Sequence, residues 1–224
     1  LHIEAHSFPT RRSSDLVEFL TGYQNAAYAS EYQAFVEKVK AAEAKLGTST
    51  KLSEAVARYL FKLMAYKDEY EVARLHTDAA FTRRVEGMFE GDYRVVHHLA
   101  PPALAGKDGQ GEPVKKSYGP WMRKAMGVLA GMKGLRGTGL DPFGRTEERR
   151  TERALIQEYR ACVDELLAGL SPERLALAVQ VASIPEDIRG YGHVKQRHLQ
   201  AARGKWAELM QRWRDPQGAE RRMA

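Results

Sequence analysis

The chain has 224 residues, 43% of them hydrophobic and 29% charged, which suits one globular domain or two small ones with a sizeable core. A single cysteine, Cys162, excludes an internal disulfide framework and any cysteine-ligated zinc or iron–sulfur site within the chain. No apolar run approaches the roughly 18 residues that cross a bilayer, so we expect no membrane partner and a cytoplasmic location, while the net charge of +6 permits an acidic partner.

The first segment, Leu1–Leu16, contains the basic, serine-rich stretch HSFPTRRSSDL. Its composition is typical of an organellar transit peptide or of a phosphorylatable basic motif. The same letters are also one reading frame of a widely used sequencing adapter, and Leu1 and His2 continue that match. We therefore expect residues 1–16 to be a non-native leader without targeting information. Residues 17–224 are then one C-terminal helical domain of an N-terminally truncated protein.

Two long helices are predicted next. Apolar side chains recur at helical spacing from Thr21 to Leu46 and again from Leu52 to Leu75. Gly47 ends the first of these helices, and the cluster Thr48-Ser49-Thr50 starts the second.

A small antiparallel hairpin is predicted near residues 93–118. Tyr93–Leu99 is the one convincing strand, Pro101-Pro102 stops it, and Val114–Tyr118 returns as a short second strand. His97 and His98 are adjacent on the first strand, so their side chains point to opposite faces and cannot chelate one ion together. No metal site is predicted in the chain.

The remaining pattern is helical. Trp121–Leu135 is amphipathic and contains three glycines, each of which costs about 1 kcal/mol relative to alanine, so we expect close packing against another backbone there. Thr146 offers an N-cap to a helix ending near Leu167, and Ser171-Pro172 offers the start of the next. After a break at Ile184-Pro185 a last helix reaches Trp213. The fold class is mainly α, with about six helices, one small hairpin and one exposed apolar patch, which we expect the rest of the polypeptide to cover.

Charged residues cluster at the start of the helix that follows Thr146. Glu148 and Glu152 share a helical face, but arginines surround them and no Glu-x-x-His partner accompanies them. Exposed ion pairing explains this pair better than a di-metal site.

Two basic, glycine-containing loops are candidate anion sites, Lys133–Gly144 and Ile188–Lys195. Glycine lets a backbone approach a ligand closely, and cations beside a helix terminus can bind an anion. The alternative is that the loops cap helices and are pinned to acids such as Asp141 and Asp187. The candidate anion contacts are Arg136, Arg189, His193 and Lys195; no catalytic residue is predicted.

Six stretches along the chain carry a resemblance: LTGYQNAAYASEY (20–32), AVARYLFKLMAYKDEYEVARL (55–75), FEGDYRVVHHLAPP (89–102), SYGPW (117–121), KGLRGTGLDPFGRTEERR (133–150) and IRGYGHVK (188–195). In order and spacing they resemble the C-terminal region of the indolepyruvate:ferredoxin oxidoreductase family, in its long fused bacterial form. Only Ser117-Tyr118 departs slightly from the aromatic-Gly-Pro-Trp pattern of that family.

The resemblance implies a 2-oxoacid:ferredoxin oxidoreductase. Such an enzyme oxidatively decarboxylates aryl pyruvates to aryl-acetyl-CoA and reduces ferredoxin, using thiamine diphosphate, Mg²⁺ and iron–sulfur clusters. None of the motifs for these cofactors lies in this chain, so the resemblance implies a helical accessory domain that is inactive alone. Its partners are then the N-terminal domains of the same polypeptide, with ferredoxin and CoA as partners of the whole enzyme. Arg149, Arg150 and Arg153 are a predicted docking surface for acidic ferredoxin.

The alternative reading is a free-standing basic helical module that binds nucleic acid or serves as an interaction scaffold. Tyr, Trp and Arg side chains are present for stacking and phosphate contact. The aromatic residues fall on inward helical positions, however, and the cations are scattered. Nucleic acid is therefore not the expected partner.

Overall fold

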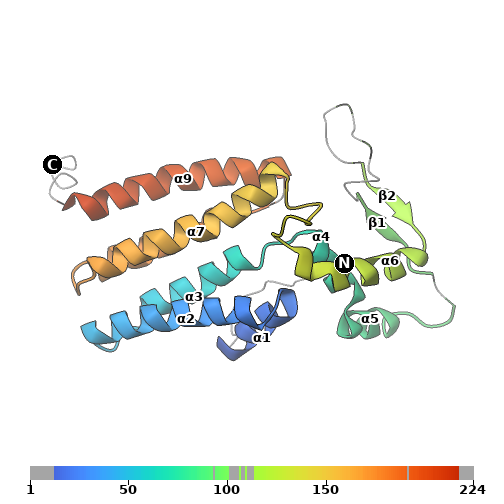
Figure 1. Cartoon of the computed structure of the whole chain (residues 1–224), viewed down its shortest axis with the longest axis horizontal. Coiled ribbons are helices and arrows are strands. Elements are labelled where there is room, and N and C mark those ends of the chain that lie inside the picture. Colours follow the sequence, from blue (N-terminus) through green and yellow to red (C-terminus); the bar gives the residue numbers. More distant parts are fainter. Residues whose placement is uncertain are drawn as a thin grey trace. The chain divides into compact units, whose positions relative to one another are not determined.

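Helices make up most of the computed structural model, which describes residues 13–92, 94–100, 106, 109, 114–190 and 192–216 (Figure 1). The chain forms two units: a smaller one that spans Lys67–Arg145, and a larger one built from the segments before and after it. The mainly α fold with one small antiparallel sheet is confirmed.

The larger unit is a set of helices packed around α3. Its elements are α1 (Ser13–Tyr23), α2 (Ala26–Glu43), the 3-10 turn η1 (Ala44–Leu46), α3 (Lys51–Met64), α7 (Glu147–Ala168), α8 (Leu175–Ala182), the 3-10 turn η3 (Ile184–Asp187) and α9 (Gly192–Arg214). Helix α3 packs on α2, α7 and α8, and α8 packs on α9. One continuous apolar core runs through these helices, with Leu60, Tyr159 and Val163 among its fully buried members.

Buried tyrosines attach this core to backbone carbonyls. The Tyr159 hydroxyl donates to the Ala182 carbonyl at 2.8 Å, and the Tyr23 hydroxyl donates to the Tyr66 carbonyl at 2.9 Å. The second bond satisfies a carbonyl just past the end of α3, where backbone acceptors lack helical partners. A buried tyrosine thus contributes apolar area without leaving its hydroxyl unpaired.

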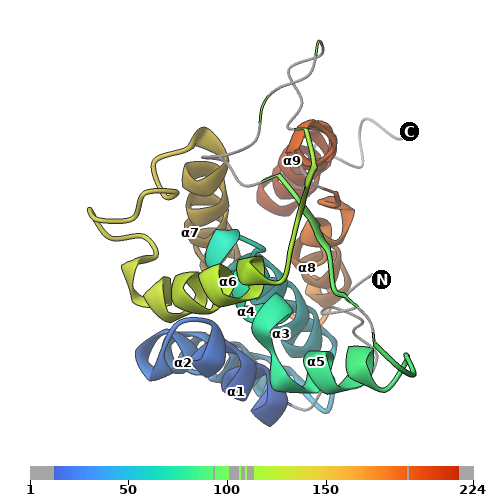
Figure 2. The same cartoon turned by 90° about the vertical axis from the view of Figure 1, so that its right-hand side faces the viewer.

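The smaller unit contains α4 (Glu69–Thr77), α5 (Ala79–Glu86), β1 (His97–Leu99), β2 (Lys116–Tyr118), α6 (Trp121–Gly131) and the 3-10 turn η2 (Met132–Leu135). Helices α4 and α6 lie side by side (Figures 1 and 2). Their shared core is small: only Ala73, Met122 and Met126 form its buried cluster among the described residues.

The hairpin is shorter than predicted. Strands β1 and β2 pair antiparallel with His97 opposite Tyr118 and Leu99 opposite Lys116. Arg94–Val96 are not part of the strand, whereas Tyr93 and Pro101-Pro102 lie outside the described residues. His97 is buried and His98 is exposed, so the prediction that they point to opposite faces is confirmed.

The described residues form nine α-helices where the sequence predicts about six. Each of the first two predicted helices is divided, because a polar side chain caps a new helix inside the periodic pattern, and α5 lies in a segment for which no element was predicted. Asn25 accepts a hydrogen bond from the Tyr28 amide and starts α2, and Asp68 accepts one from the Glu71 amide and starts α4. Apolar periodicity continues across both breaks and therefore does not reveal them.

Two predicted caps have different outcomes. Thr146 accepts a hydrogen bond from the Arg149 amide and caps α7, as predicted. Ser171 does not cap α8, which begins at Leu175 behind Arg174; its hydroxyl donates to Glu173 instead. No described part of the chain packs closely on Gly127, Gly131 or Gly134, because a Cβ at any of the three would meet nothing within 4 Å.

No helix in the described part of the chain combines the length and apolar character needed to cross a membrane.

A buried glutamate at the end of α2 caps α3. Glu43 is 1% exposed, and its carboxylate accepts from the amides of Leu52 at 2.9 Å and Ser53 at 2.8 Å and from the Ser49 hydroxyl at 3.0 Å. Thr50, the residue just before α3, makes no side-chain cap. The cap predicted from the Thr48-Ser49-Thr50 cluster thus comes from a carboxylate across the turn.

Replacing Glu43 therefore tests the packing of α2 on α3. We expect Glu43→Ala to lower the free energy of unfolding by about 2–3 kcal/mol, because two buried amides lose their acceptor. Glu43→Gln retains one oxygen and should lose about half as much. Denaturant unfolding measures the difference, with Glu37→Ala on the exposed side of α2 as control, expected to change stability by less than about 0.5 kcal/mol. Equal effects of Glu43→Ala and Glu37→Ala would contradict this role.

Candidate functional site

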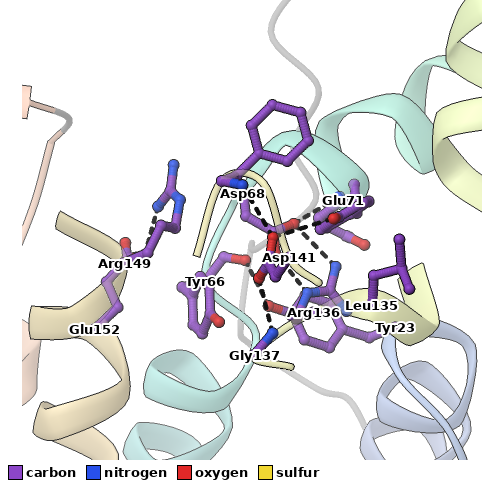
Figure 3. Close-up of polar contacts among 12 residues, drawn as sticks. Tyr23, Tyr66, Asp68, Glu71, Leu135, Arg136, Gly137, Asp141, Arg149 and Glu152 are labelled. Carbon is purple, nitrogen blue, oxygen red and sulfur yellow. Dashed lines mark hydrogen bonds and ion pairs between the residues drawn. The ribbon is translucent and has the colours of Figure 1, made fainter. Parts of the chain in front are cut away.

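A buried ion pair joins α4 to the end of η2 in the smaller unit. The Arg136 guanidinium donates from Nε to Asp68 Oδ2 at 2.5 Å and from Nη2 to Asp68 Oδ1 at 2.9 Å (Figure 3). The two side chains are 5% and 3% exposed. Asp68 is also the N-cap of α4, so one carboxylate holds both a helix start and an arginine. The anion predicted for Arg136 is thus an internal carboxylate in this structure.

The loop after Arg136 is closed by Asp141. Its carboxylate accepts from the amides of Gly137 at 2.8 Å and Phe143 at 3.1 Å and from the Tyr70 hydroxyl at 3.1 Å. Burial raises the pKa of Asp141, but these hydrogen bonds outweigh it and hold the pKa below its usual range. Burial and the bond to Asp141 raise the pKa of Tyr70. The interpretation that this loop is pinned to Asp141 is confirmed.

Two glycines in this loop are required by its geometry. Gly137 has a φ of +74°, a left-handed conformation that other residues rarely adopt. A Cβ on Gly144 would collide with the Asp141 carboxylate. These glycines therefore serve loop closure, which explains the pattern without a ligand.

Neighbouring charges on α4 and η2 extend the network. Arg74 donates to both oxygens of the buried Glu71 at 2.8 Å, and this bonding raises the pKa of Arg74 despite its partial burial. Burial, followed by the nearby Arg74 and Arg136, lowers the pKa of Lys133. Much of the positive charge in this segment is therefore directed inward.

A cavity of about 310 Å³ opens beside the first turns of α7 and α9 in the larger unit. It brings together two of the predicted anion contacts, His193 and Lys195, whereas Arg189 is not in its lining and Arg136 belongs to the smaller unit. The complete lining is Glu147, Glu148, Thr151, Glu152, Leu155, Gly192, His193, Lys195, Gln196 and Leu199.

Glu152 lies at the polar end of this lining, between two cations. Its Oε2 accepts from Arg149 and its Oε1 accepts from Lys195 (the Arg149 bond is drawn in Figure 3). Glu152 is 5% exposed and Arg149 is 9% exposed. Exposed ion pairing was predicted for both Glu148 and Glu152. The prediction is wrong for Glu152, which is buried, whereas Glu148 is exposed. Arg149 also faces the Tyr66 ring at 5.9 Å and is unsuited to a ferredoxin-docking surface.

The charge of the cavity lining does not favour the binding of an anion. Three glutamates face the cavity against Lys195 and His193, and the Lys195 ammonium already contacts Glu152. Arg189 is exposed and lies 3.5 Å from Glu186, a surface pairing of small energetic value. Asp187 pairs with Lys205 of α9 at 2.8 Å, which pins this second loop as the alternative interpretation predicts.

Two titratable groups of note, Lys62 and His76, were not singled out from the sequence, and His97 was weighed there only as a metal ligand. Burial, followed by the nearby Arg189, lowers the pKa of Lys62 to about 8, and its ammonium donates to the Pro185 carbonyl at 2.7 Å. His76 on α4 and His97 on β1 have ring centroids 5.8 Å apart. Burial lowers the pKa of both histidines; His97 adds to the effect on His76, and Arg123 adds to that on His97. Their positions, 21 residues apart, give no sequence signal for this contact.

The described residues assemble no evident reactive centre. Within them, no three His, Cys, Asp or Glu side chains are placed to hold a metal ion. Burial raises the pKa of the Cys162 thiol to about 11, and the Trp206 indole donates to its sulfur at 3.1 Å. Cys162 is therefore a protonated, packed side chain at neutral pH. The polar clusters join elements of the fold to one another.

Comparison with known proteins places most of the chain in one family. The model of DUF6537, described as a family of unknown function, matches residues 13–208, so the chain belongs to that family. Neither the curated proteins nor the solved structures contain a significant match.

The Asp68–Arg136 pair can be tested by removing one partner. We expect Arg136→Ala to destabilise the smaller unit by about 3–5 kcal/mol, because Asp68 then stays buried without its counter-charge. The double variant Asp68→Asn with Arg136→Met should be less destabilised, since it retains a cap on α4 and buries no charge. Hydrogen exchange of the α4 amides reports the change. Arg145→Ala, at an exposed position nearby, is the control; equal protection in all variants would exclude a structural role for the pair.

The His76–His97 contact predicts a pH dependence. Both pKa values are lowered in the folded chain, so below about pH 6.5 the unfolded chain binds protons that the folded chain does not, and stability falls as the pH falls. We expect the denaturation midpoint to be lower at about pH 5.5 than at about pH 8. His97→Asn should reduce this difference, and His98→Asn, on the exposed face of the same strand, should not. An identical pH dependence in the two variants would rule the contact out as its source.

Proposed function

We propose that this member of the DUF6537 family is the C-terminal accessory domain of a 2-oxoacid:ferredoxin oxidoreductase of the indolepyruvate type. The observation that carries the proposal is the ordered resemblance of six stretches over Val17–Arg214. In this proposal the domain contributes packing and assembly to an enzyme whose reacting groups lie elsewhere in the same polypeptide.

The positions of the shared motifs support an accessory role. The stretch 133–150 contains Arg136, Asp141 and Arg149, and the stretch 55–75 contains Asp68 and its neighbours on α4. These are the residues that form the buried ion pairs and the closed loop. Catalytic side chains need access to a substrate, whereas these polar side chains are directed into the fold. These motifs therefore serve to stabilise the fold, which is what an accessory domain requires.

The cofactors of the whole enzyme do not fit the described residues. Cys162 is the chain's only cysteine, and the described side chains provide no group of three metal ligands. Thiamine diphosphate with Mg²⁺ and the iron–sulfur clusters, which carry the carbanion and electron-transfer chemistry, are therefore assigned to the N-terminal domains. CoA and ferredoxin are partners of the complete enzyme, which we place in the cytoplasm. This domain alone is inactive in the proposal.

The test starts from the native gene. We expect the DNA upstream of the Val17 codon to encode thiamine- and cluster-binding domains in the same reading frame. The complete polypeptide should reduce ferredoxin in the presence of indolepyruvate and CoA, and the purified chain of 224 residues should not. Turnover by the chain alone, or an upstream sequence without such domains, would contradict the proposal.

The accessory role itself needs a separate measurement. Arg136→Ala in the complete enzyme should lower the yield of assembled protein by destabilising this domain. The rate per cluster in the protein that does assemble should change by less than about two-fold, because no reacting group is touched. A selective loss of rate with normal assembly would instead place Arg136 in the catalytic machinery.

A further inference from the structure

Exposed apolar surface is concentrated in the smaller unit. Every large hydrophobic side chain that is well exposed among the described residues belongs to Lys67–Arg145, and none belongs to the larger unit. Three of them lie on α6 and η2: Trp121 is 57% exposed, Val128 is 69% exposed and Met132 is 40% exposed. A cluster of this kind is typical of an interaction surface.

Helix α6 is apolar on two adjacent sides. Met122 and Met126 face the small core of the unit, together with Leu129. Trp121, Val128 and Met132 are separated by seven and four positions, which places them within about 40° of one another around the helix axis. With Ala125 between them they form a continuous row, called here the α6 stripe. The apolar surface of α6 is therefore wider than the part that faces the core of its own unit.

The side of α6 next to this stripe carries two glycines and the side chain of Lys124. Gly127 and Gly131 lie one turn apart, and a Cβ on either would meet nothing within 4 Å. Each glycine weakens the helix by about 1 kcal/mol relative to alanine, and no described neighbour uses the space that it leaves. Such a surface lets the backbone of a second helix approach closely. Its geometry therefore suits a helix as the occupant.

The charged side chains on α6 itself are of one sign. Residues 114–140 contain no acid, and four of their cations, Lys115, Lys116, Arg123 and Lys124, are exposed, whereas Arg136 is buried against Asp68. Arg123 and Lys124 are exposed on α6 itself. Two copies of this surface facing each other would bring like charges together, which disfavours a dimer through the stripe. A complementary partner carries carboxylates beside its apolar residues.

The exposed cations favour a separate protein, and not a permanently attached domain, as the occupant of the stripe. The buried centres of permanent interfaces are depleted in charged residues. A patch of one sign mainly accelerates the encounter of molecules that meet by diffusion. We propose that the α6 stripe docks an acidic amphipathic helix carried by a separate protein. This inference does not depend on the oxidoreductase assignment, and it replaces the expectation from the sequence that the rest of the polypeptide covers the exposed apolar patch.

The test uses the complete chain and two synthetic peptides of about 18 residues that share one apolar helical face. One peptide carries glutamates on its polar face, and the other carries lysines. Trp121 is an exposed reporter, whereas Trp206 and Trp213 are buried in the larger unit. We expect the glutamate peptide to shift the tryptophan emission to shorter wavelengths and to bind at least about ten-fold more tightly than the lysine peptide.

Two matched variants locate the binding. Val128→Glu places a carboxylate on the stripe and should weaken binding of the labelled glutamate peptide about ten-fold, measured by fluorescence anisotropy. Leu140→Glu makes the same chemical change at a 78% exposed position on the loop and should leave affinity within about two-fold. Both side chains are exposed, so both variants should fold, and far-UV circular dichroism checks this.

Several outcomes would overturn the proposal. Failure of the glutamate peptide to bind, or equal effects of the two variants, would show that the stripe is not its docking site. Concentration-dependent self-association that Val128→Glu abolishes would identify a second copy as the occupant. An emission shift that vesicles of phosphatidylserine or a single-stranded oligonucleotide produce, with sensitivity to Val128→Glu and no response to the peptide, would assign the surface to a membrane or to nucleic acid.

Discussion

The buried ion pair between Asp68 and Arg136 is the interaction on which the smaller unit depends most. Removing two charges from water is costly, and only good geometry and additional hydrogen bonds offset that cost. Both conditions hold here: the guanidinium binds both carboxylate oxygens, and one of these oxygens also caps α4. The pair connects a helix start to a turn 68 residues later in the chain. Arg136 also marks the start of the next loop, and the Asp141 carboxylate closes that loop by accepting hydrogen bonds from its amides.

The sequence predicts the features that local rules control. The hairpin, the Thr146 cap and the helical core follow from alternation, capping chemistry and apolar spacing. Contacts made over long distances in the chain are different. Nothing around Glu43 indicates that its carboxylate caps α3, and the charged segment 147–153 gives no sign that Glu152 is buried against Lys195 of another helix. Glycine and arginine patterns were ambiguous for a related reason, because an internal carboxylate and an external anion require the same residues.

Because of that ambiguity, the four predicted anion contacts have different environments in the structure. Arg136 and Arg189 were equivalent in the sequence, as cations beside glycines in two similar loops. In the structure Arg136 is buried against Asp68, and Arg189 is an exposed side chain near Glu186. His193 and Lys195 do meet in one cavity, but glutamates outnumber them there. Burial, which depends on the tertiary fold, decides whether a basic loop holds the protein together or faces solvent.

The two units differ in how they obtain stability, and this difference accounts for the exposed stripe on α6. The larger unit has an extensive apolar core and places its large hydrophobic side chains inside it. Among the described residues, the buried cluster of the smaller unit contains only a few methionine and alanine side chains, so this unit relies on ion pairs and a closed loop. A small core cannot cover a helix whose apolar surface is this wide. A partner that covered the outer face of α6 would bind the folded unit selectively and stabilise it by mass action. The weak core and the proposed docking surface are thus two consequences of one shortage of apolar volume.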